Sequence, residues 1–499
     1  MPRTEQQQII VEKSDSKEIK SLGVKALAGT GKSFLLKEIV KEYPEKNFLG
    51  LAFNGSIASS NSKSFPDKNS YWNTVHGLAR NFFEKQNIPL GNIKSEIKPI
   101  ELIDSIGIKN NDFELASLVL RMHEIFSNSS VKNITVDDIV KASKAQRRYI
   151  ELAPYHSWFE DAVKHLETYW NMQIKGKIPA THDFYLKFFE LKGFAKTIKN
   201  FDVKLIDEAQ DSNAVTMSIV NQISGNNIYV GDSHQSIYNF RGALDAMKFA
   251  DENYPLSKTF RYIQDIADRA SDVLNFYKGE EKRIESAVES VDIDDNTHAI
   301  LCRNNSTMVE KIDELVQKEI DFKTIANPDK IFNLAISIYE FKVEKKIPNS
   351  KGLKYFKRFN DYEELSIYIE ESKDQELKTA DKLQKRYGAK NKETGKYSRK
   401  LYQLKTVAKQ NFFRKDIKLF LCSVHMSKGL EWGKVTLEKD FKDLDEIMEE
   451  ANIENSLDLM DRASMNEVTA NNIVQEVNLF YVGITRAKRY LENYTKNQF

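Results

Sequence analysis

A glycine-bearing loop between two apolar segments constrains the fold of this chain more than any other feature. Residues 26–33 read ALAGTGKS, with a strand-like apolar run before them and a helix-like run, FLLKEIVKEY, after them. Gly29 and Gly31 allow backbone N–H groups to converge on phosphate oxygens at the start of a helix. Lys32 can reach the outer phosphates of a nucleotide, and the Ser33 hydroxyl can bind magnesium. The loop therefore predicts an α/β fold that binds a nucleoside triphosphate.

The loop departs from the strict GxxxxGK[ST] pattern at one position, because Ala26 stands where that pattern has its first glycine. A chance glycine-rich turn is the alternative, and the strand before the loop and the helix after it argue against that alternative. The residues of this loop that we expect to contact the nucleotide are Ala28, Gly29, Thr30, Gly31, Lys32 and Ser33.

Length and composition indicate a folded chain of several domains without a strong overall charge. At 499 residues the chain exceeds what one hydrophobic core usually serves, so about two to four domains are expected. The 74 Lys and Arg residues nearly balance the 73 Asp and Glu residues, so any surface for nucleic acid must be local. Cys302 and Cys422 both lie in strand-like apolar runs, which favours buried core residues over a disulfide or a zinc site.

The hydropathy pattern gives no sign of a membrane segment. No apolar run approaches the ~18 residues that span a bilayer, and the polar start MPRTEQQQ is unlike a signal peptide. We therefore expect a soluble protein that is not secreted and has no membrane partner. The expected location is the cytoplasm or the nucleoid, inside the host cell if the source is a virus.

A second motif ends in carboxylates. The segment FDVKLIDEAQD, residues 201–211, is an apolar strand pattern followed by acidic residues, as in the second magnesium-associated element of P-loop ATPases. Asp207 would face the metal, and Glu208 could orient or deprotonate the water that attacks the γ-phosphate. An exposed acidic turn is the alternative, and the phosphate loop earlier in the chain favours the catalytic interpretation.

Two long segments interrupt the motifs. About 175 residues lie between Lys32 and Asp207, far more than a βαβ crossover needs, and residues 82–198 show helical periodicity, for example in FELASLVLRMHEIF and WFEDAVKHLETYWNMQI. A second helix-like stretch, rich in lysine, runs from Arg303 to about Lys409. Its basic residues form either a solvated helix face or a surface for duplex DNA phosphates. They are Lys382, Lys385, Arg386, Lys390, Lys392, Lys396, Arg399, Lys400 and Lys405.

Further motifs carry a resemblance to a known family. The segment NNIYVGDSHQSIYNFRGA, residues 226–243, resembles motif III of the UvrD/Rep-type superfamily 1A DNA helicases. The presence of ALAGTGKS and LIDEAQD earlier in the chain supports this resemblance. TEQQQII resembles the adenine-reading Q motif of that family, TVHGLA its motif Ib, and the segment TFR, residues 259–261, its motif IV. SVHMSKGLEW resembles motif V, and EVNLFYVGITRAKR resembles motif VI. All of these segments occur in the order that the family has.

Within that family, the segments LAFNGSIASS, TVHGLA, TFRY and KGLEWGKVTLEKDF most resemble the F-box DNA helicase branch, although no F-box is evident. Four residues depart from the family pattern. Phe34 replaces an arginine beside the adenine, Ser423 replaces a threonine, and Gln475 and Asn478 replace charged residues of motif VI. We expect these departures to change nucleotide affinity rather than the chemistry.

The resemblance implies an α/β fold of two RecA-like P-loop motor lobes, each with a mainly helical inserted subdomain. It implies that both lobes close on one ATP with Mg²⁺, with Ser33 and Asp207 at the metal. The implied catalytic residues are Lys32, Asp207, Glu208, Gln235, Arg261 and Arg486. Further implied nucleotide contacts are Gln7, Phe260 and Glu431. The implied division is 1–81 and 199–262 for the first lobe, 82–198 for its insertion, 263–325 and 412–499 for the second lobe, and 326–411 for the basic insertion.

The same resemblance implies a path for single-stranded DNA, which needs aromatic faces for bases and donors for phosphates. The implied DNA contacts are Phe53, Asn54, Thr74, His76, Tyr238, Phe240 and His425. Core packing is the alternative, above all for Phe53, which ends an apolar strand pattern.

The resulting hypothesis is an ATP-dependent helicase that moves 3′-to-5′ on single-stranded DNA and unwinds duplex, in replication, recombination or repair. Its implied substrates are single-stranded and tailed duplex DNA, and its candidate protein partners are recombination or replication proteins. One alternative is a translocase that strips proteins such as recombinase filaments from DNA without strand separation. A non-enzymatic ATP switch is a third hypothesis, and the presence of Glu208, Gln235, Arg261 and Arg486 argues against it.

Overall fold

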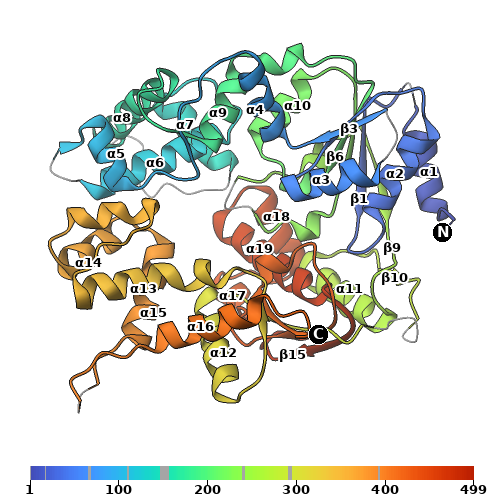
Figure 1. The fold of residues 1–499 in the computed structure, drawn as a ribbon. Coiled ribbons are helices and arrows are strands. Elements are labelled where there is room, and N and C mark those ends of the chain that lie inside the picture. Colours follow the sequence, from blue (N-terminus) through green and yellow to red (C-terminus); the bar gives the residue numbers. More distant parts are fainter. Residues whose placement is uncertain are drawn as a thin grey trace. The chain divides into compact units, whose positions relative to one another are not determined.

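The chain divides into two compact units (Figure 1). The computed structural model describes residues 2–16, 18–65, 69–109, 112–146, 157–238, 242–289, 295–391 and 394–499. Unit 1 comprises Met1–Ile97, Val119–Glu289 and Glu446–Tyr481, and unit 2 comprises Lys98–Leu118, Ser290–Asp445 and Val482–Phe499. Each unit is built on a parallel sheet, which confirms the predicted α/β class with two sheet-based lobes.

The sheet of unit 1 has, within the described residues, six parallel strands in the order β3-β2-β6-β7-β1-β8. The strands are β1 (Ser21–Ala26), β2 (Phe48–Leu51), β3 (Ser70–Asn73), β6 (Val203–Asp207), β7 (Asn226–Gly231) and β8 (Glu252–Leu256). Strand β6 is buried at all of its positions, as expected for a central strand of a parallel sheet with both faces covered. The carboxyl ends of β1, β6 and β7 therefore meet at one edge, where parallel sheets bind ligands.

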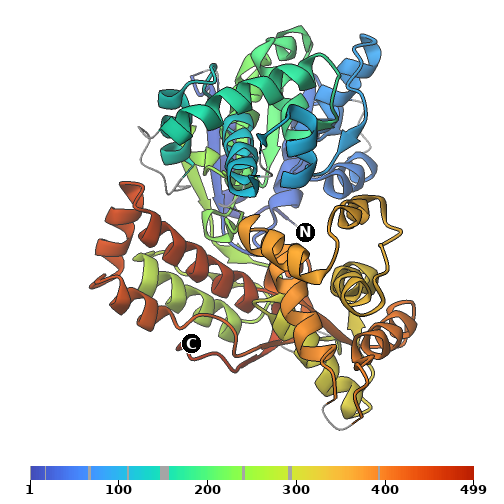
Figure 2. The ribbon, with the colours of Figure 1, turned by 90° about the vertical axis from the view of Figure 1, so that its left-hand side faces the viewer.

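Helices and short elements surround this sheet. The helices that alternate with its strands are α1 (Glu5–Lys13), α2 (Lys32–Glu42), α3 (Gly55–Ser64), α4 (Val75–Lys85), α10 (Ala214–Gln222) and α11 (Gln264–Lys278). Short strands β9 (Lys258–Thr259) and β10 (Glu285–Ser286) pair beside them. Two helices from late in the chain, α18 (Ser456–Ser464) and α19 (Val468–Ile484), lie beside α11 (Figure 2). The core under α2 contains Val24, Leu35, Ile39 and Leu205.

The first predicted insertion is helical. Its elements are α5 (Pro99–Ile106), α6 (Phe113–Ser127), α7 (Val136–Ala145), α8 (Ser157–Ile174) and α9 (His182–Leu191), with a short pair of strands, β4 (Ile93–Lys94) and β5 (Ala180–Thr181). Helices α6 and α8 cover the two segments whose periodicity predicted helices. Figure 1 shows α7, α8 and α9 as a helical group beside the sheet of unit 1.

The sheet of unit 2 has five parallel strands in the described part of the chain, in the order β12-β13-β11-β14-β15. They are β11 (His298–Cys302), β12 (Lys323–Thr324), β13 (Leu419–Ser423), β14 (Trp432–Leu437) and β15 (Ala487–Asn493). Cys302 and Cys422 are free and buried in β11 and β13, as predicted. Burial raises the pKa of the Cys422 thiol to about 12, so this group stays neutral.

Helices of unit 2 share one core. They are α12 (Asn305–Gln317), α13 (Pro328–Glu344), α14 (Tyr362–Glu371), α15 (Gln375–Tyr387), α16 (Lys400–Phe412) and α17 (Leu444–Glu450), and Figure 1 shows α13 to α16 together. Ile100 of α5 belongs to this core, and Lys98 forms an ion pair with Asp374 at 2.8 Å. Helix α5, predicted in the first insertion, therefore belongs to unit 2 by its contacts.

The two units cut across the predicted four-part division. Residues 263–289 and 446–481 were assigned to the second lobe by resemblance, yet they pack within unit 1. The boundaries of lobes and insertions stay a prediction. In the part of the chain that the structure describes, no helix combines the length and hydropathy needed to cross a membrane.

The basic segment of the second insertion is largely engaged in ion pairs. Lys385 contacts Asp381 at 2.7 Å, and Lys400 contacts Asp313 at 2.8 Å. Arg386, Arg399 and Lys405 pair with Glu310, Glu344 and Asp329, respectively. Lys392 lies outside the described residues. These pairs favour the solvated, charge-balanced surface over a continuous surface for DNA phosphates.

Candidate nucleotide and DNA site

The phosphate loop connects the end of β1 to the start of α2. Gly29 and Gly31 have φ angles of +77° and +86°, a backbone region that L side chains rarely adopt. A Cβ atom at position 29 would stand 2.4 Å from the Thr259 hydroxyl, so only glycine fits there. Gly31 caps α2 without a side-chain hydrogen bond, which leaves the first N–H groups of the helix for an anion. The loop thus has the local geometry that the sequence predicted.

Two tyrosines hold the backbone of the phosphate loop by hydrogen bonds to Ala28. The Tyr262 hydroxyl donates to the Ala28 carbonyl at 3.0 Å, and the Ala28 N–H donates to the Tyr481 hydroxyl at 3.1 Å. The Thr30 hydroxyl donates to the Leu27 carbonyl at 2.8 Å and is buried. Ala28 and Thr30 therefore hold the shape of the loop, and Ser33 is exposed at the first turn of α2.

Lys32 is paired with Glu208. The Lys32 ammonium lies 2.9 Å from each carboxylate oxygen of Glu208. Burial disfavours the charged ammonium, but the negative charges of Glu208 and Asp207 outweigh burial and raise the pKa of Lys32. The predicted phosphate-binding lysine and the predicted catalytic base are thus in direct contact.

Asp207 ends the buried strand β6 and is itself only 6% exposed. Burial and the neighbouring charge of Glu208 raise the pKa of Asp207 to about 6. Glu208 follows with a φ angle of +53°, a strained conformation for a residue with a side chain. The strand therefore delivers two adjacent carboxylates with different orientations.

A hydrogen-bond network joins Glu208 to the segment after β7. Gln210 donates to Glu208 at 2.5 Å, and its amide oxygen accepts the backbone N–H of Asp232 at 3.0 Å. Asp232 in turn accepts from Gln235 at 2.7 Å and from the Tyr481 hydroxyl at 3.2 Å. Gln235, one of the predicted catalytic residues, is therefore connected to Glu208 through hydrogen-bonded groups.

Sequence reasoning missed most of the connecting groups. Gln210 follows the predicted carboxylates by two residues and could have been suspected as a polar residue behind a strand end. Tyr481 lies in an apolar run of motif VI, and Tyr262 follows Arg261, so neither gave a signal of its role.

Two of the predicted nucleotide contacts, Gln7 and Phe260, lie near Gly31. A Cβ atom at position 31 would lie 3.2 Å from Nε2 of Gln7 and 3.9 Å from the Phe260 ring. Gln7 is held by a capping box with Thr4, in which Thr4 N–H donates to the Gln7 amide oxygen at 3.0 Å. The backbone N–H of Phe260 donates to the Gly29 carbonyl at 2.9 Å. The backbone N–H of Arg261, the next residue, donates to the Thr259 hydroxyl at 3.3 Å.

Three of the predicted site residues, Arg486, Glu431 and His425, lie in unit 2. Arg486 is 1% exposed and donates to the carbonyls of Val482 and Leu430 at 3.0 and 3.2 Å. Glu431 forms an ion pair with Lys488 at 3.2 Å. His425 is half-buried in the single turn η9 (Val424–Ser427). Their roles at the nucleotide and at DNA stay predictions.

A cavity of about 570 Å³ in unit 1, here called the groove, brings the other predicted DNA contacts together. The predicted contacts that line it are Phe53, Asn54, Thr74, His76 and Tyr238. The rings of Phe53 and Tyr238 stack with centroids 5.4 Å apart and an interplanar angle of 15°. Phe53 is 37% exposed, which argues against the core-packing alternative. Phe240 lies outside the described residues.

Two polar residues of the groove, Asn54 and Thr74, are held in place because they cap the N-termini of helices. Asn54 caps α3 by accepting from Ile57 N–H at 2.9 Å, and Thr74 caps α4 by accepting from Gly77 N–H at 2.9 Å. Burial, followed by the nearby His182, lowers the pKa of His76 to about 4, so His76 is neutral at pH 7. His182, at the start of α9, also lines the groove and was missed, because nothing in a helical insertion marks one histidine as a site residue.

The groove is also lined by Asp207 and Glu208. As far as the structure describes its walls, no lysine or arginine contributes to them. Its chemistry is therefore that of aromatic rings and neutral polar groups together with carboxylates, which belong to Glu124, Asp183, Asp207, Glu208 and Asp211. No group of three or more His, Cys, Asp or Glu side chains that could hold a metal by themselves occurs among the described residues.

The fold and this site define a P-loop nucleotide-binding protein with a second parallel α/β unit. Residues 4–254 match the UvrD/REP helicase N-terminal domain, and residues 333–495 match the UvrD-like helicase C-terminal domain. The chain belongs to the UvrD/Rep helicase family.

Individual relatives agree with the predicted branch of the family. The chain is 25% identical to F-box DNA helicase protein 1 of Schizosaccharomyces pombe over 94% of this chain and 55% of the relative. It is 24% identical to F-box DNA helicase 1 of Gallus gallus over 98% of this chain and 48% of the relative. The chain thus spans about half the length of these relatives. Among solved structures, the match to the PRRSV helicase covers 98% of this chain and 54% of the helicase chain. The sequence identity of that match is 10%, and its TM-score is 0.32.

Proposed function

We propose that this chain is an ATP-driven DNA helicase that moves along single-stranded DNA and separates duplex DNA ahead of it. The observation that carries the proposal is the lining of the groove. The stacked rings of Phe53 and Tyr238 and the carboxylates of Asp207 and Glu208 line one cavity. A DNA base stacked on these rings would therefore stand in the same cavity as the groups proposed to act on ATP.

The side chains present fit magnesium-bound ATP. Asp207 offers a buried carboxylate whose raised pKa reflects burial and the charge of Glu208, and a divalent cation would relieve that repulsion. Ser33 and Asp207 would hold the ion, since oxygen donors suit Mg²⁺ and the phosphates complete its shell. When bound, Mg²⁺ neutralises charge on the β- and γ-phosphates.

The chain's own residues would then act in sequence. The triphosphate would attract Lys32 away from Glu208, because the phosphates carry more negative charge than one carboxylate. Glu208, still held by Gln210, would become free to accept a proton from the attacking water. Gln235 would respond to the γ-phosphate through its bond to Asp232. Arg261 and Arg486 are proposed to stabilise charge on the γ-phosphoryl group.

Membership in the UvrD/Rep family supports the finer parts of the proposal. They are 3′-to-5′ polarity, action on single-stranded and tailed duplex DNA, and a place in replication, recombination or repair. The similarity to relatives named as DNA helicases supports DNA as the substrate.

DNA dependence of ATP hydrolysis tests the proposal. We expect single-stranded oligonucleotides to raise the rate of ATP hydrolysis by the wild-type chain, and Lys32→Ala to abolish hydrolysis with and without DNA. A wild-type chain whose hydrolysis ignores single-stranded DNA would refute the proposal, because coupling of the two sites is its central element.

A further inference from the structure

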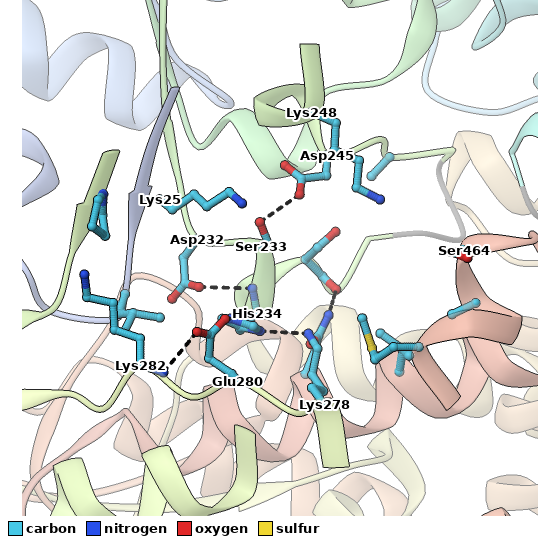
Figure 3. A pocket seen from close by; sticks show the side chains of 18 of the residues that line it. Lys25, Asp232, Ser233, His234, Asp245, Lys248, Lys278, Glu280, Lys282 and Ser464 are labelled. Atoms are coloured by element: carbon cyan, nitrogen blue, oxygen red, sulfur yellow. Dashed lines mark hydrogen bonds and ion pairs between the residues drawn. The ribbon is translucent and has the colours of Figure 1, made fainter. Parts of the chain in front are cut away.

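A second cavity of unit 1, of about 400 Å³, lies beside the segment that follows β7 (Figure 3). Four lysines line it, Lys25, Lys248, Lys278 and Lys282, and we call it the lysine cavity. Its walls come from β1, from the turn η6 (Ala246–Phe249), from α11 and from α18 and α19. None of these lysines belongs to the nucleotide site described above.

The carboxylates of the lysine cavity are engaged by groups other than lysine ammoniums. Asp245 accepts from the Ser233 hydroxyl at 2.7 Å. Glu280 accepts the backbone N–H of Lys282 at 3.2 Å and faces Nε2 of His234 at 3.5 Å. Asp232 accepts the backbone N–H of His234 at 3.0 Å. Figure 3 shows these contacts around the cavity.

Lys278 is fixed by neutral acceptors. Its ammonium donates to Nδ1 of His234 at 2.8 Å and to the side-chain oxygen of Asn478 at 2.9 Å. Burial, and then the charge of Lys278, lower the pKa of His234, so this ring is neutral at pH 7. Burial lowers the pKa of Lys278 to about 8, which leaves it mostly charged at pH 7. The cavity therefore keeps a fixed positive charge that no carboxylate contacts directly.

Among the described residues, three lysine ammoniums of the lysine cavity have no carboxylate partner, and one buried side-chain oxygen has no hydrogen-bond donor. Within the part of the chain that the structure describes, the ammoniums of Lys25, Lys248 and Lys282 form no ion pair. Asn471, which also lines the cavity, is 4% exposed, and its side-chain oxygen has no hydrogen-bond partner. Its amide nitrogen is used, because it donates to the Glu467 carbonyl at 2.8 Å. A buried acceptor of this kind requires a donor.

We propose that the lysine cavity binds a small organophosphate, with its phosphate on Lys25 and Lys248 and a hydroxyl or amino group donating to the Asn471 oxygen. The volume suits a ligand of this size, and Leu256, Met460 and Val474 offer an apolar wall for its carbon skeleton. Three unpaired ammoniums attract a dianion, and the orphan acceptor selects an organic phosphate over the inorganic ion.

The occupant would also contact the nucleotide network. Asp232 lines the lysine cavity and accepts from Gln235 at 2.7 Å. A phosphate bound beside Asp232 would change its electrostatic environment and, through Gln235, the rate of ATP hydrolysis. The binding step itself does not depend on the proposed helicase function, so the two can fail separately.

Calorimetric titration of the full chain with ribose 5-phosphate, in saturating ADP to fill the phosphate loop, tests the proposal. We expect saturable one-to-one binding that the double variant Lys25→Gln/Lys248→Gln weakens at least tenfold. A matched double variant, Lys13→Gln/Lys144→Gln, removes two exposed lysines outside the cavity and should bind like the wild type.

Ribose and inorganic phosphate complete the titration. We expect ribose not to bind and inorganic phosphate to bind more weakly than ribose 5-phosphate in the wild type. Asn471→Leu should remove that difference, and the lysine variants keep the test valid if Asn471→Leu fails to fold. Absence of saturable binding at millimolar concentration, or binding that the cavity lysines do not affect, would overturn the proposal. Equal binding of inorganic phosphate and ribose 5-phosphate by the wild type would overturn the role of Asn471.

Discussion

At the scale of single residues, the contact between Lys32 and Glu208 is the most informative feature of the site. Both residues were predicted from separate motifs about 175 positions apart, and the structure places them 2.9 Å from each other. The hydrogen bonds from Glu208 to Gln210 and from Gln210 to Asp232 were not predicted, because the motifs do not show which of their polar residues meet in the fold. Sequence patterns identify groups with intrinsic chemistry, and they miss groups that act only by position.

Replacing Glu208 by Gln tests its role as the base. The change keeps the size of the side chain but removes the proton acceptor, so we expect kcat for ATP hydrolysis to fall by about 10²- to 10⁴-fold. ADP affinity should stay within a few-fold of wild type, because Lys32 remains available for phosphate. Steady-state hydrolysis and ADP titration measure both quantities. The exposed Glu45→Gln serves as the control, and a Glu208→Gln variant with near wild-type kcat would exclude the assigned role.

The raised pKa of Asp207 predicts that the free energy of unfolding depends on pH. Its pKa is raised from 3.8 to about 6 in the folded chain, so the folded state binds more protons than the unfolded state between these values. Stability contributed by this group is therefore full below pH 3.8 and falls as the pH rises to about 6. We expect Asp207→Asn to stabilise the chain at pH 7 by up to about 3 kcal/mol, and the gain to vanish near pH 4. Thermal unfolding at both pH values measures this, and a destabilised Asp207→Asn at pH 7 would contradict it.

At the scale of elements, helix α9 connects the interior of unit 1 to the groove. Its first residues, His182 and Asp183, line the groove. Further along, Lys187 and Glu190 form a buried ion pair at 3.0 Å, and the Lys187 ammonium also binds the carbonyls of Ser129 and Val131. The periodicity of the insertion predicted helices but not which residues their faces contact. The assignment of α5 to unit 2 shows this limit, because its apolar face is covered by residues distant in sequence.

The buried pair on α9 should be costly to break. Glu190→Gln leaves the Lys187 ammonium buried without its counter-charge, and we expect a loss of about 3–5 kcal/mol in the free energy of unfolding. The exposed Glu167→Gln on α8 should have little effect. The double variant Lys187→Met/Glu190→Leu should be less destabilised than Glu190→Gln, because no buried charge remains uncompensated and Lys132, which also pairs with Glu190, is exposed. Urea unfolding of the three variants measures these losses, and a double variant that is at least as destabilised as Glu190→Gln would refute the coupling.

The stacked rings at the ends of β2 and of the segment after β7 predict DNA affinity. We expect Phe53→Ala to weaken binding of a single-stranded oligonucleotide by about 1–3 kcal/mol, since Phe53 is exposed and stacks on Tyr238. Fluorescence anisotropy at fixed salt concentration measures the change. Phe249→Ala removes another exposed phenylalanine of unit 1 that does not line the groove, and it should bind as the wild type does. Equal affinity of Phe53→Ala and wild type would remove Phe53 from the DNA path.

At the scale of the whole molecule, ordered motifs predicted two parallel-sheet lobes of the UvrD/Rep family, and the sheets and family matches confirm them. Motifs succeed here because three of them, the phosphate loop, LIDEAQD and the segment after β7, mark the carboxyl ends of β1, β6 and β7, where the fold requires particular residues. The basic segment of unit 2 shows the limit of charge patterns, since Arg386 and Lys400 pair with Glu310 and Asp313, which are distant in sequence.

The central claim is that ATP hydrolysis at Lys32 and Glu208 drives strand separation. Its most direct test is an unwinding assay with duplexes that carry a 3′ tail, a 5′ tail or no tail, using the wild-type chain and Lys32→Ala, with ATP hydrolysis followed in parallel. We predict that only the 3′-tailed duplex opens, and only with Lys32 present. DNA-stimulated hydrolysis without opening of any duplex would contradict the claim and favour a translocase that strips proteins from DNA.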